Sequence, residues 1–338
     1  MELERRSLRI GAAVIVCAIL LRLLSGGMAG RVVHALGSPE MTSFLLYMET
    51  GRIVRPMEPI PSTEPAETAS PPETEPPAET VGPAPLGRPA VFTAEDAALV
   101  QVRNSGGYDL DLEALLTQSL SWNLVYPEPT VLILHTHTSE SYVNTEGYTE
   151  DGSYRTLDER YNMLSIGDRI TELLENRGIS VIHDRELHDY PSYNGSYTHA
   201  RAAIAAYLEE YPSIRLVLDI HRDAAEDSSG NQIATTATVD GKTAAQLMLV
   251  VGSNAGGQSY PNWQQNMALA VKLHAQLEKL APGICRPISF RSQRFNQDLS
   301  PGAVLVEVGA AGNTRQQALL AAEVLAQAIL ALAYGAGA

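Results

Sequence analysis

The stretch VLILHTHTSESY, residues 131–142, joins a short apolar run to a dense group of polar side chains. Four consecutive apolar residues, 131–134, are typical of a strand that is buried on both faces of a parallel sheet. The residues that follow include His135, His137 and Glu140, whose side chains can bind metals and carry protons. This junction therefore predicts a parallel sheet with a functional site where one of its strands ends.

Downstream of this stretch, apolar runs typical of strands alternate with longer segments that repeat apolar residues at helical spacing. Strands are predicted at residues 180–184, 214–220, 234–239, 246–253 and 303–309, and helices at residues 157–177, 198–211, 262–280 and 314–333. Gly178 follows the first of these helices as a stop signal. The alternation predicts an α/β fold of three layers, with helices on both faces of a mostly parallel sheet.

The N-terminal segment is first basic and then apolar. Three arginines within residues 1–9 precede the apolar residues 10–21, and Arg22 interrupts a run that continues for two more leucines. We expect residues 1–30 to be a cytoplasmic stub and a retained signal anchor that crosses the cell membrane once. The basic residues in front predict that the rest of the chain lies outside the cytoplasm. A cleaved signal peptide and a buried helix of a cytosolic protein are the alternatives.

Composition divides the rest of the chain into three parts. Residues 31–90 contain a juxtamembrane stretch and then a Pro/Glu/Thr-rich linker, since eleven of the twenty prolines lie within residues 56–89. Such a linker cannot bury enough apolar surface to fold. Residues 91–129 are predicted to be a lead-in segment, and residues 130–335 a compact domain that holds the chemistry.

Composition also excludes several classes of protein. The net charge of −15 gives no electrostatic footprint for phosphates, so no nucleic acid partner is expected. Hydrophobic residues make up 45% of the chain, which is enough for a sizeable core. The two cysteines, Cys17 and Cys285, lie far apart and form no CxxC pair. A disulfide framework is therefore excluded, and a cysteine zinc site is disfavoured.

Three predicted strand ends carry chemically active side chains, and parallel strands bring their carboxyl ends to one edge of a sheet. They are the histidine-rich stretch above, LDIHRDA around His221, and VLVEVG with Glu307. Two histidines and a carboxylate match the ligands of a catalytic zinc site, which leaves one position for water. We therefore predict that His137, Glu140 and His221 bind Zn²⁺ and that Glu307 is the general base.

Several of these assignments stay open at the level of sequence. His135 competes with His137 as the first ligand, although only His137 has the three-residue spacing to Glu140. Glu159, early in a predicted helix, is the rival carboxylate ligand. Two further candidates that would support or replace a ligand are Arg222 and Asp223. The competing interpretation of the histidine-rich stretch is a polar loop without a metal.

Polar residues in other predicted loops are candidates for substrate binding. HDYPSYNGSYTHAR, residues 188–201, is rich in Tyr, Asn and Ser, although a turn and a helix N-cap would explain the same residues. VVGSN, residues 250–254, ends a predicted strand, and RFNQDLSPGA, residues 294–303, precedes the strand of Glu307. The candidates for substrate contact are Tyr193, Asn194, Asn254, Asn296 and Gln297.

These stretches resemble the stage II sporulation protein P family. The resemblance rests on HTHTSESY, NxxxxGD at residues 162–168, ISVIHDRELHDYPSYNGSYTHAR, DIHRDA, VVGSN, FNQDLSPGAVLVEVG and Asn313, and covers most of residues 131–320. The anchor and the linker fit the layout of that family as well. The resemblance implies a fold of the amidase and zinc-carboxypeptidase type, which is phosphorylase/hydrolase-like.

The resemblance also implies an activity. It points to a zinc-dependent peptidoglycan hydrolase that cleaves the N-acetylmuramoyl-L-alanine amide, with cleavage of peptide cross-links as a further activity. It implies work at the sporulation septum, in the intermembrane space, during engulfment, with stage II sporulation proteins D and M as partners. A non-catalytic wall-binding scaffold and a zinc carboxypeptidase that acts on wall peptides are the alternative functions.

Overall fold

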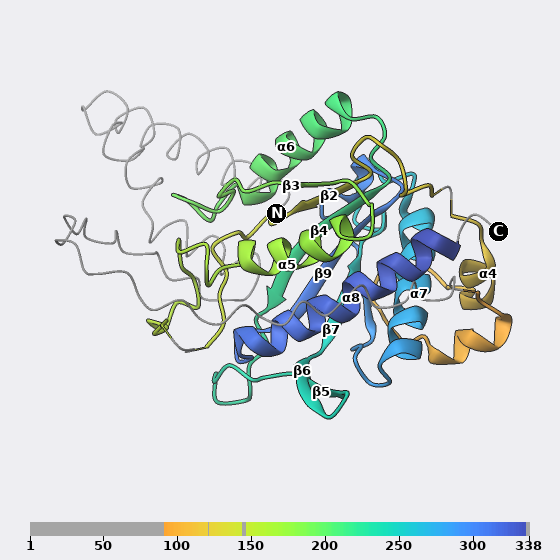
Figure 1. Ribbon diagram of the computed structural model, residues 1–338. Helices are drawn as coiled ribbons and strands as arrows, with labels where there is room; N and C mark the ends of the chain where they lie inside the picture. The colour runs from red at the N-terminus through yellow and green to blue at the C-terminus, as the bar shows by residue number, and fades with distance from the viewer. Residues whose placement is uncertain (1–90, 121, 144–146, 336–338) are drawn as a thin grey trace, which may run out of the picture. The chain divides into compact units, whose positions relative to one another are not determined.

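A seven-stranded sheet forms the centre of the computed structural model, which describes residues 91–120, 122–143 and 147–335 (Figure 1). The predicted anchor and linker, residues 1–90, lie outside these described residues. The sheet has the order β1-β8-β7-β9-β4-β2-β3. Its strands are β1 (Val102–Asn104), β2 (Val131–Leu134), β3 (Val181–His183), β4 (Leu216–Asp223), β7 (Leu247–Val251), β8 (Ile288–Phe290) and β9 (Ala303–Ala310).

Helices cover both faces of this sheet, which confirms the predicted three-layer α/β fold (Figure 1). One face carries α6, and the other carries α5, α7 and α8. A separate antiparallel hairpin consists of β5 and β6. The bounds of these elements are α4 (Leu112–Thr117), α5 (Leu164–Glu175), α6 (Ser196–Glu210), α7 (Trp263–Leu280), α8 (Arg315–Gly335), β5 (Thr236–Val239) and β6 (Lys242–Ala245), with short 3₁₀ turns η1 (Ala94–Leu99) and η2 (Gln297–Leu299).

The apolar run of β2 is buried on both faces because successive side chains of a strand point to opposite sides. Leu132 and Leu134 pack with Ile204 of α6. Val131 and Ile133 belong to the larger core on the opposite face. Each side chain buried in this way stabilises the fold by roughly 1.5–3 kcal/mol. The run therefore fixes β2 between the two helical layers, and the polar residues after it must leave the sheet at its edge.

The pairing of β7 with β9 is antiparallel, whereas every other pairing in the described sheet is parallel. As a result, the carboxyl ends of β2, β3, β4 and β9 lie together along one side of the sheet, at the ends of the strands, and we call this side the site edge. The strands β1, β7 and β8 end at the opposite edge. Polar residues that follow strands are thus divided between two edges.

Most of the predicted strands and helices are present, with shifted ends. The helix predicted from residue 157 begins at Leu164, because Asn162 pairs with Ser141 of the histidine-rich loop in an isolated bridge. Two strands of three residues, β1 and β8, were not predicted, and neither was β6. The lead-in segment, residues 91–129, therefore contributes β1, which is an outermost strand of the sheet. β1 and β8 contain polar residues within three positions, VRN and ISF, and so show no apolar run that would reveal a strand.

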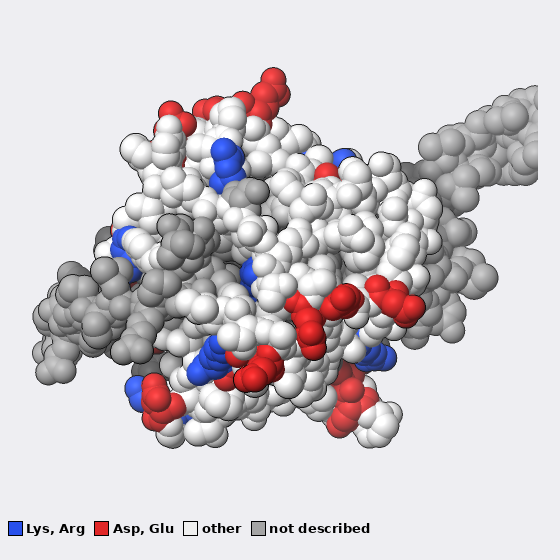
Figure 2. Space-filling view, turned by 90° about the vertical axis from the view of Figure 1, so that its right-hand side faces the viewer, with Lys and Arg blue, Asp and Glu red and all other residues white. Residues whose placement is uncertain are grey.

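The helix α8 is the one helix in the described residues that is long and apolar enough to cross a membrane. More than half of its apolar window is buried, and Leu325 and Ile329 lie in the core, so we interpret it as a core helix. The face of the domain on the side of α4 and α7 shows scattered acidic side chains and no gathering of basic ones (Figure 2). That face offers no attraction to a polyanion.

We expect Asn313→Ala to destabilise the domain by roughly 2–4 kcal/mol, because it removes several buried hydrogen bonds at once. The carboxamide oxygen accepts from the backbone of Ala310 and Thr235, and the nitrogen donates to Thr235 and Gln317. It thus joins β9, α8 and the β5–β6 hairpin. Urea unfolding measures the change, with the exposed Asn194→Ala as the control. Equal stability of the two variants would contradict this role.

Candidate active site

The site edge brings together the three strand ends that the sequence singles out. β4 and β9 pair in register, so that His221 lies directly opposite Glu307. β4 lies between β9 and β2, and the loop after β2 carries His137 and Glu140. Residues about 85 positions apart in the chain are thereby placed on adjacent strands. The prediction that these strand ends meet is confirmed.

The histidine-rich loop is fixed to β4 by Asp219, a residue that the sequence analysis did not assign. One carboxylate oxygen of Asp219 accepts from the backbone N–H of Thr136 at 2.8 Å, and the other accepts from its hydroxyl at 2.7 Å. The hydroxyl of Thr138 donates to the carbonyl of His135 at 2.8 Å, which closes the turn. These side-chain contacts act together with backbone bridges from Glu140 to Arg155 and from Ser141 to Asn162 to hold the loop.

His221 is buried between two carboxylates. Its Nε2 lies 2.8 Å from Asp219 Oδ1, and its Nδ1 lies 3.7 Å from Glu140 Oε2. This close ion pair with Asp219 engages Nε2 and leaves Nδ1, on the side of Glu140, as the ring nitrogen that a metal could bind. Burial alone would lower the pKa of His221, but Asp219 reverses this and raises the pKa to about 9. His221 therefore carries a positive charge in the metal-free chain.

His137 is buried beside His221, with perpendicular rings whose centroids lie 5.2 Å apart. Its Nε2 lies 3.1 Å from the hydroxyl of Tyr193, while its buried Nδ1 has no hydrogen-bond partner in the described part of the chain. Burial, and then the charge of His221, lower the pKa of His137 well below its usual value. This ring is therefore neutral, which is the form that binds metals.

Glu140 is positioned by two arginines. The backbone N–H of Arg222 donates to Oε2 at 3.2 Å, and its guanidinium donates to Oε1 at 3.4 Å. Arg155 lies 3.6 Å from Oε1. The remaining donors of Arg222 reach the carbonyls of Ser141 and Tyr154 at 3.0 and 2.8 Å. Arg222 therefore holds the loop and the carboxylate in place, and it does not point to a substrate.

Glu307 is partly exposed as a residue, yet its Oε2 is fully buried and has no hydrogen-bond partner within the described residues. Burial raises the pKa of this carboxyl to about 8, with Glu140 adding to the effect and His221 opposing it. A carboxyl group with a pKa near neutrality can both accept and return a proton. Its place opposite His221 is the one expected of a general base.

The donor set at the site edge fits a zinc ion in chemical type. Each buried polar atom without a partner costs roughly 1–3 kcal/mol, and two of the predicted site residues hold such an atom here. They are His137 Nδ1 and Glu307 Oε2. Two ligands of one tetrahedral zinc lie about 3.4 Å apart, which is close to the 3.7 Å between His221 and Glu140. His137, however, does not complete a set of three donor atoms within 4.8 Å of one another.

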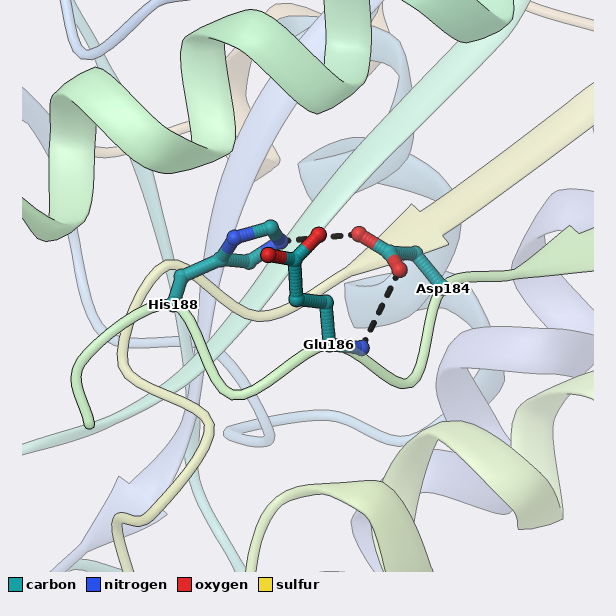
Figure 3. A group of neighbouring side chains, drawn as sticks. All are labelled: Asp184, Glu186 and His188. Carbon is teal, nitrogen blue, oxygen red and sulfur yellow. Dashed lines mark hydrogen bonds and ion pairs between the residues drawn. The ribbon is translucent and has the colours of Figure 1, made fainter. Parts of the chain in front are cut away.

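Asp184, Glu186 and His188 form the one such set in the described residues, on the loop after β3 (Figure 3). The sequence analysis did not assign them, although their D-x-E-x-H spacing at a strand end was visible. Asp184 and His188 already pair at 2.8 Å, and Asp184 also accepts from the backbone of Glu186 at 3.1 Å. Glu186 is exposed. These contacts explain the group as a brace for the loop, with metal binding as its alternative use.

The other candidates for metal support are engaged by other groups. Both ring nitrogens of His135 are engaged, by the Ile220 carbonyl at 2.9 Å and by His183 at 2.9 Å, so His135 offers no free ligand atom. Glu159 is exposed and pairs with Arg185 at 2.6 Å. Asp223 follows an irregularity in β4 and pairs with Arg286 at 2.7 Å. Ion pairing of these two carboxylates, which the sequence did not reveal, removes them from the site.

The structure also separates the candidates for substrate contact. Tyr193 and the exposed Asn194 lie on the loop before α6, and Tyr193 stacks on His137. Asn296 donates to the carbonyl of Tyr197 at 2.7 Å and so supports this wall of the site. Gln297 is buried and bonds to the backbone of β7, a structural role. Asn254 follows β7 and therefore lies at the opposite edge, where it accepts from a tyrosine hydroxyl.

Comparison with known proteins identifies the family. Residues 59–330 match the family model described as stage II sporulation protein P. The chain belongs to the stage II sporulation protein P family. It is 28% identical over 208 residues to stage II sporulation protein P of Bacillus subtilis (strain 168), an alignment that covers 58% of this chain and 49% of that protein. The chain thus spans about half the length of this relative, and the family resemblance seen in the sequence is confirmed.

Two solved amidases are similar in structure at low scores. N-acetylmuramoyl-L-alanine amidase AmiC2 of Nostoc punctiforme has a TM-score of 0.37 and 16% identity, and covers 60% of this chain and 95% of its own. The CwlD amidase of Clostridioides difficile, solved with the GerS lipoprotein, has a TM-score of 0.36 and 15% identity. The match covers 61% of this chain and 95% of the amidase chain. Likeness at this level carries no inference about the chemistry of the site.

We expect Glu307→Gln to stabilise the metal-free chain increasingly as the pH rises from about 5 to about 8. The carboxyl has a pKa of about 8 when folded, against 4.5 ordinarily, so folding takes up a proton in this range and the parent loses stability as pH rises through it. Glutamine does not ionise, so the variant does not lose stability in this way as the pH rises. Thermal unfolding with chelator present, at both ends of the range, measures the difference. A difference that does not change with pH would contradict the burial of this carboxyl.

Proposed function

We propose that this chain is a zinc-dependent N-acetylmuramoyl-L-alanine amidase that removes stem peptides from peptidoglycan during sporulation. Membership of the stage II sporulation protein P family supports the biological setting. The observation that supports the chemistry is that His221 lies opposite Glu307 and 3.7 Å from Glu140 at one edge of the described sheet, with unpartnered buried atoms on His137 and Glu307. Buried polar atoms are usually hydrogen-bonded, so these two favour a bound group.

In this proposal His137, Glu140 and His221 hold the metal. Zinc at this position would polarise the scissile carbonyl and lower the pKa of a water molecule. The charged partners of the ligands prepare them for this role, since Asp219 orients His221 and Arg222 orients Glu140. Carboxylate partners of metal-binding histidines fix ring orientation in the same way.

Glu307 performs the proton transfers of the proposed reaction. Its carboxylate takes a proton from water as the water oxygen attacks the amide carbonyl, and it returns that proton to the nitrogen of the leaving L-alanine. The bond between the lactyl carbonyl and this nitrogen then breaks. Tyr193 borders the same cluster, and it is the proposed contact to the substrate together with the exposed Asn194 beside it in the chain.

The setting of the reaction is part of the same proposal. We propose that residues 1–30 anchor the chain in the cell membrane, that the linker spaces the domain from it, and that the domain faces peptidoglycan at the sporulation septum. Stage II sporulation proteins D and M are the proposed partners. The acidic composition of the chain fits this view, because it gives no attraction to nucleic acid.

We expect His221→Ala to abolish tight zinc binding, because it removes a ligand, whereas Glu307→Gln should keep the zinc and lose hydrolysis by a factor of at least about 100. Metal content after dialysis and dye release from labelled peptidoglycan provide the two readouts. His188→Ala is the matched control for the second group of donors. Full zinc content in His221→Ala, together with loss of zinc in His188→Ala, would indicate that the metal binds at the loop of Asp184, Glu186 and His188 instead.

We expect the products from purified peptidoglycan to be free stem peptides that begin with L-alanine, along with glycan strands that have lost their peptides. Mass spectrometry of the muropeptides identifies the bond that is cut. Shortened stems still attached to muramic acid would indicate the carboxypeptidase alternative. Binding of peptidoglycan without any new product, in a zinc-loaded protein, would favour the wall-binding scaffold.

A further inference from the structure

Tyr193 is clamped against His137, although 40% of the tyrosine is exposed. The two rings stack with their centroids 4.5 Å apart and their planes at 16°. The guanidinium carbon of Arg155 lies 4.7 Å from the centre of the tyrosine ring. Arg155 is itself fixed, by Asp189 at 2.7 Å and by the hydroxyl of Ser139 at 3.2 Å. The phenol hydroxyl therefore has a defined position at the histidine.

The hydroxyl of Tyr193 lies 3.1 Å from Nε2 of His137, and a neutral imidazole carries its hydrogen on only one nitrogen. If the phenol donated to Nε2, the ring hydrogen would lie on the buried Nδ1, which meets no acceptor among the described residues. A buried N–H without an acceptor is rarer in proteins than an unused lone pair. If Nε2–H donates instead, Nδ1 keeps a lone pair, and the hydroxyl of the partly exposed tyrosine donates its own hydrogen bond to solvent.

We propose that Tyr193 is a positioning residue for the metal site. Its phenol oxygen accepts the Nε2–H of His137, which fixes the ring tautomer and leaves Nδ1 as the metal-binding atom. This inference rests on the proposed zinc chemistry and assigns the residue that prepares one of its ligands. Partners of this kind typically change metal affinity by a factor of 10–100 when they are removed.

A tautomer measurement tests the inference without any metal. In full-length, metal-free chain labelled with nitrogen-15 histidine, we expect two-bond correlation spectra to show an Nε2–H tautomer for His137. In Tyr193→Phe, which keeps the ring stack and loses the hydroxyl, neither ring nitrogen has a partner among the described residues, so we expect the Nδ1–H form to appear beside the Nε2–H form. An Nδ1–H tautomer in the parent chain would overturn the proposal, and so would an unchanged Nε2–H tautomer in Tyr193→Phe.

Zinc affinity gives the second readout, measured by competition with a chromogenic chelator. We expect Tyr193→Phe to bind zinc about 10-fold more weakly than the parent, or weaker still. Tyr197→Phe is the matched control, because Tyr197 meets the same ring edge-on at 5.6 Å without a hydrogen bond between the two side chains. Its zinc affinity should equal that of the parent.

The outcomes separate this inference from the proposed function. If His221→Ala loses zinc and Tyr193→Phe binds it as tightly as the parent, the positioning role is wrong and the zinc site stands. If His221→Ala keeps full zinc affinity, the proposed site itself is wrong. If Tyr193→Phe and Tyr197→Phe weaken zinc binding equally, the effect belongs to packing of the aromatic wall, and the role of the hydroxyl is refuted.

Discussion

The buried carboxylate of Asp219 is the constraint on which the site edge depends. It accepts from the backbone and the hydroxyl of Thr136 and lies 2.8 Å from His221, so one side chain connects the histidine-rich loop to the strand beside it. Burial would raise the pKa of this acid, but His221 and the two donors of Thr136 hold it at about 2. An ionised carboxylate in the interior is tolerated only with such partners. The position of His137 therefore depends on a residue that never faces the substrate.

The antiparallel pairing of β7 with β9 is the second constraint, because it decides which polar residues can meet. Four strands end at the site edge and three at the other, so the asparagine after β7 lies far from the histidines although its sequence context resembles theirs. An apolar run specifies burial on two faces but carries no information about direction. The alternation of strands and helices predicted the layers correctly, and it could not predict this reversal.

The sequence revealed residues whose types are costly to bury and concealed those whose role depends on a partner. His137 and Glu140 follow an apolar strand, and His221 and Glu307 lie near the carboxyl ends of two others, where burying such side chains is costly unless they have a role. Glu159 has the same type of side chain, but its carboxylate pairs with an arginine 26 residues away in the chain. Sequence alone does not separate His135 from His137, whereas in the fold Ile220 and His183 occupy both nitrogens of His135. Such pairings form only in the fold, because local spacing does not encode them.

The two proposed histidine ligands are prepared by opposite means. Asp219 favours the charged form of His221, whose pKa is raised, whereas a neutral phenol, burial and nearby positive charge keep His137 uncharged. A metal ion accepts only the unprotonated nitrogen of a histidine. Binding at neutral pH must therefore release a proton from His221 and none from His137. The carboxylate that makes His221 hold its proton also makes it a stronger ligand once that proton has left. The pairing of Asp219 with His221 thus lowers metal affinity at a pH below the pKa of His221, and it strengthens the metal bond at a pH above that pKa.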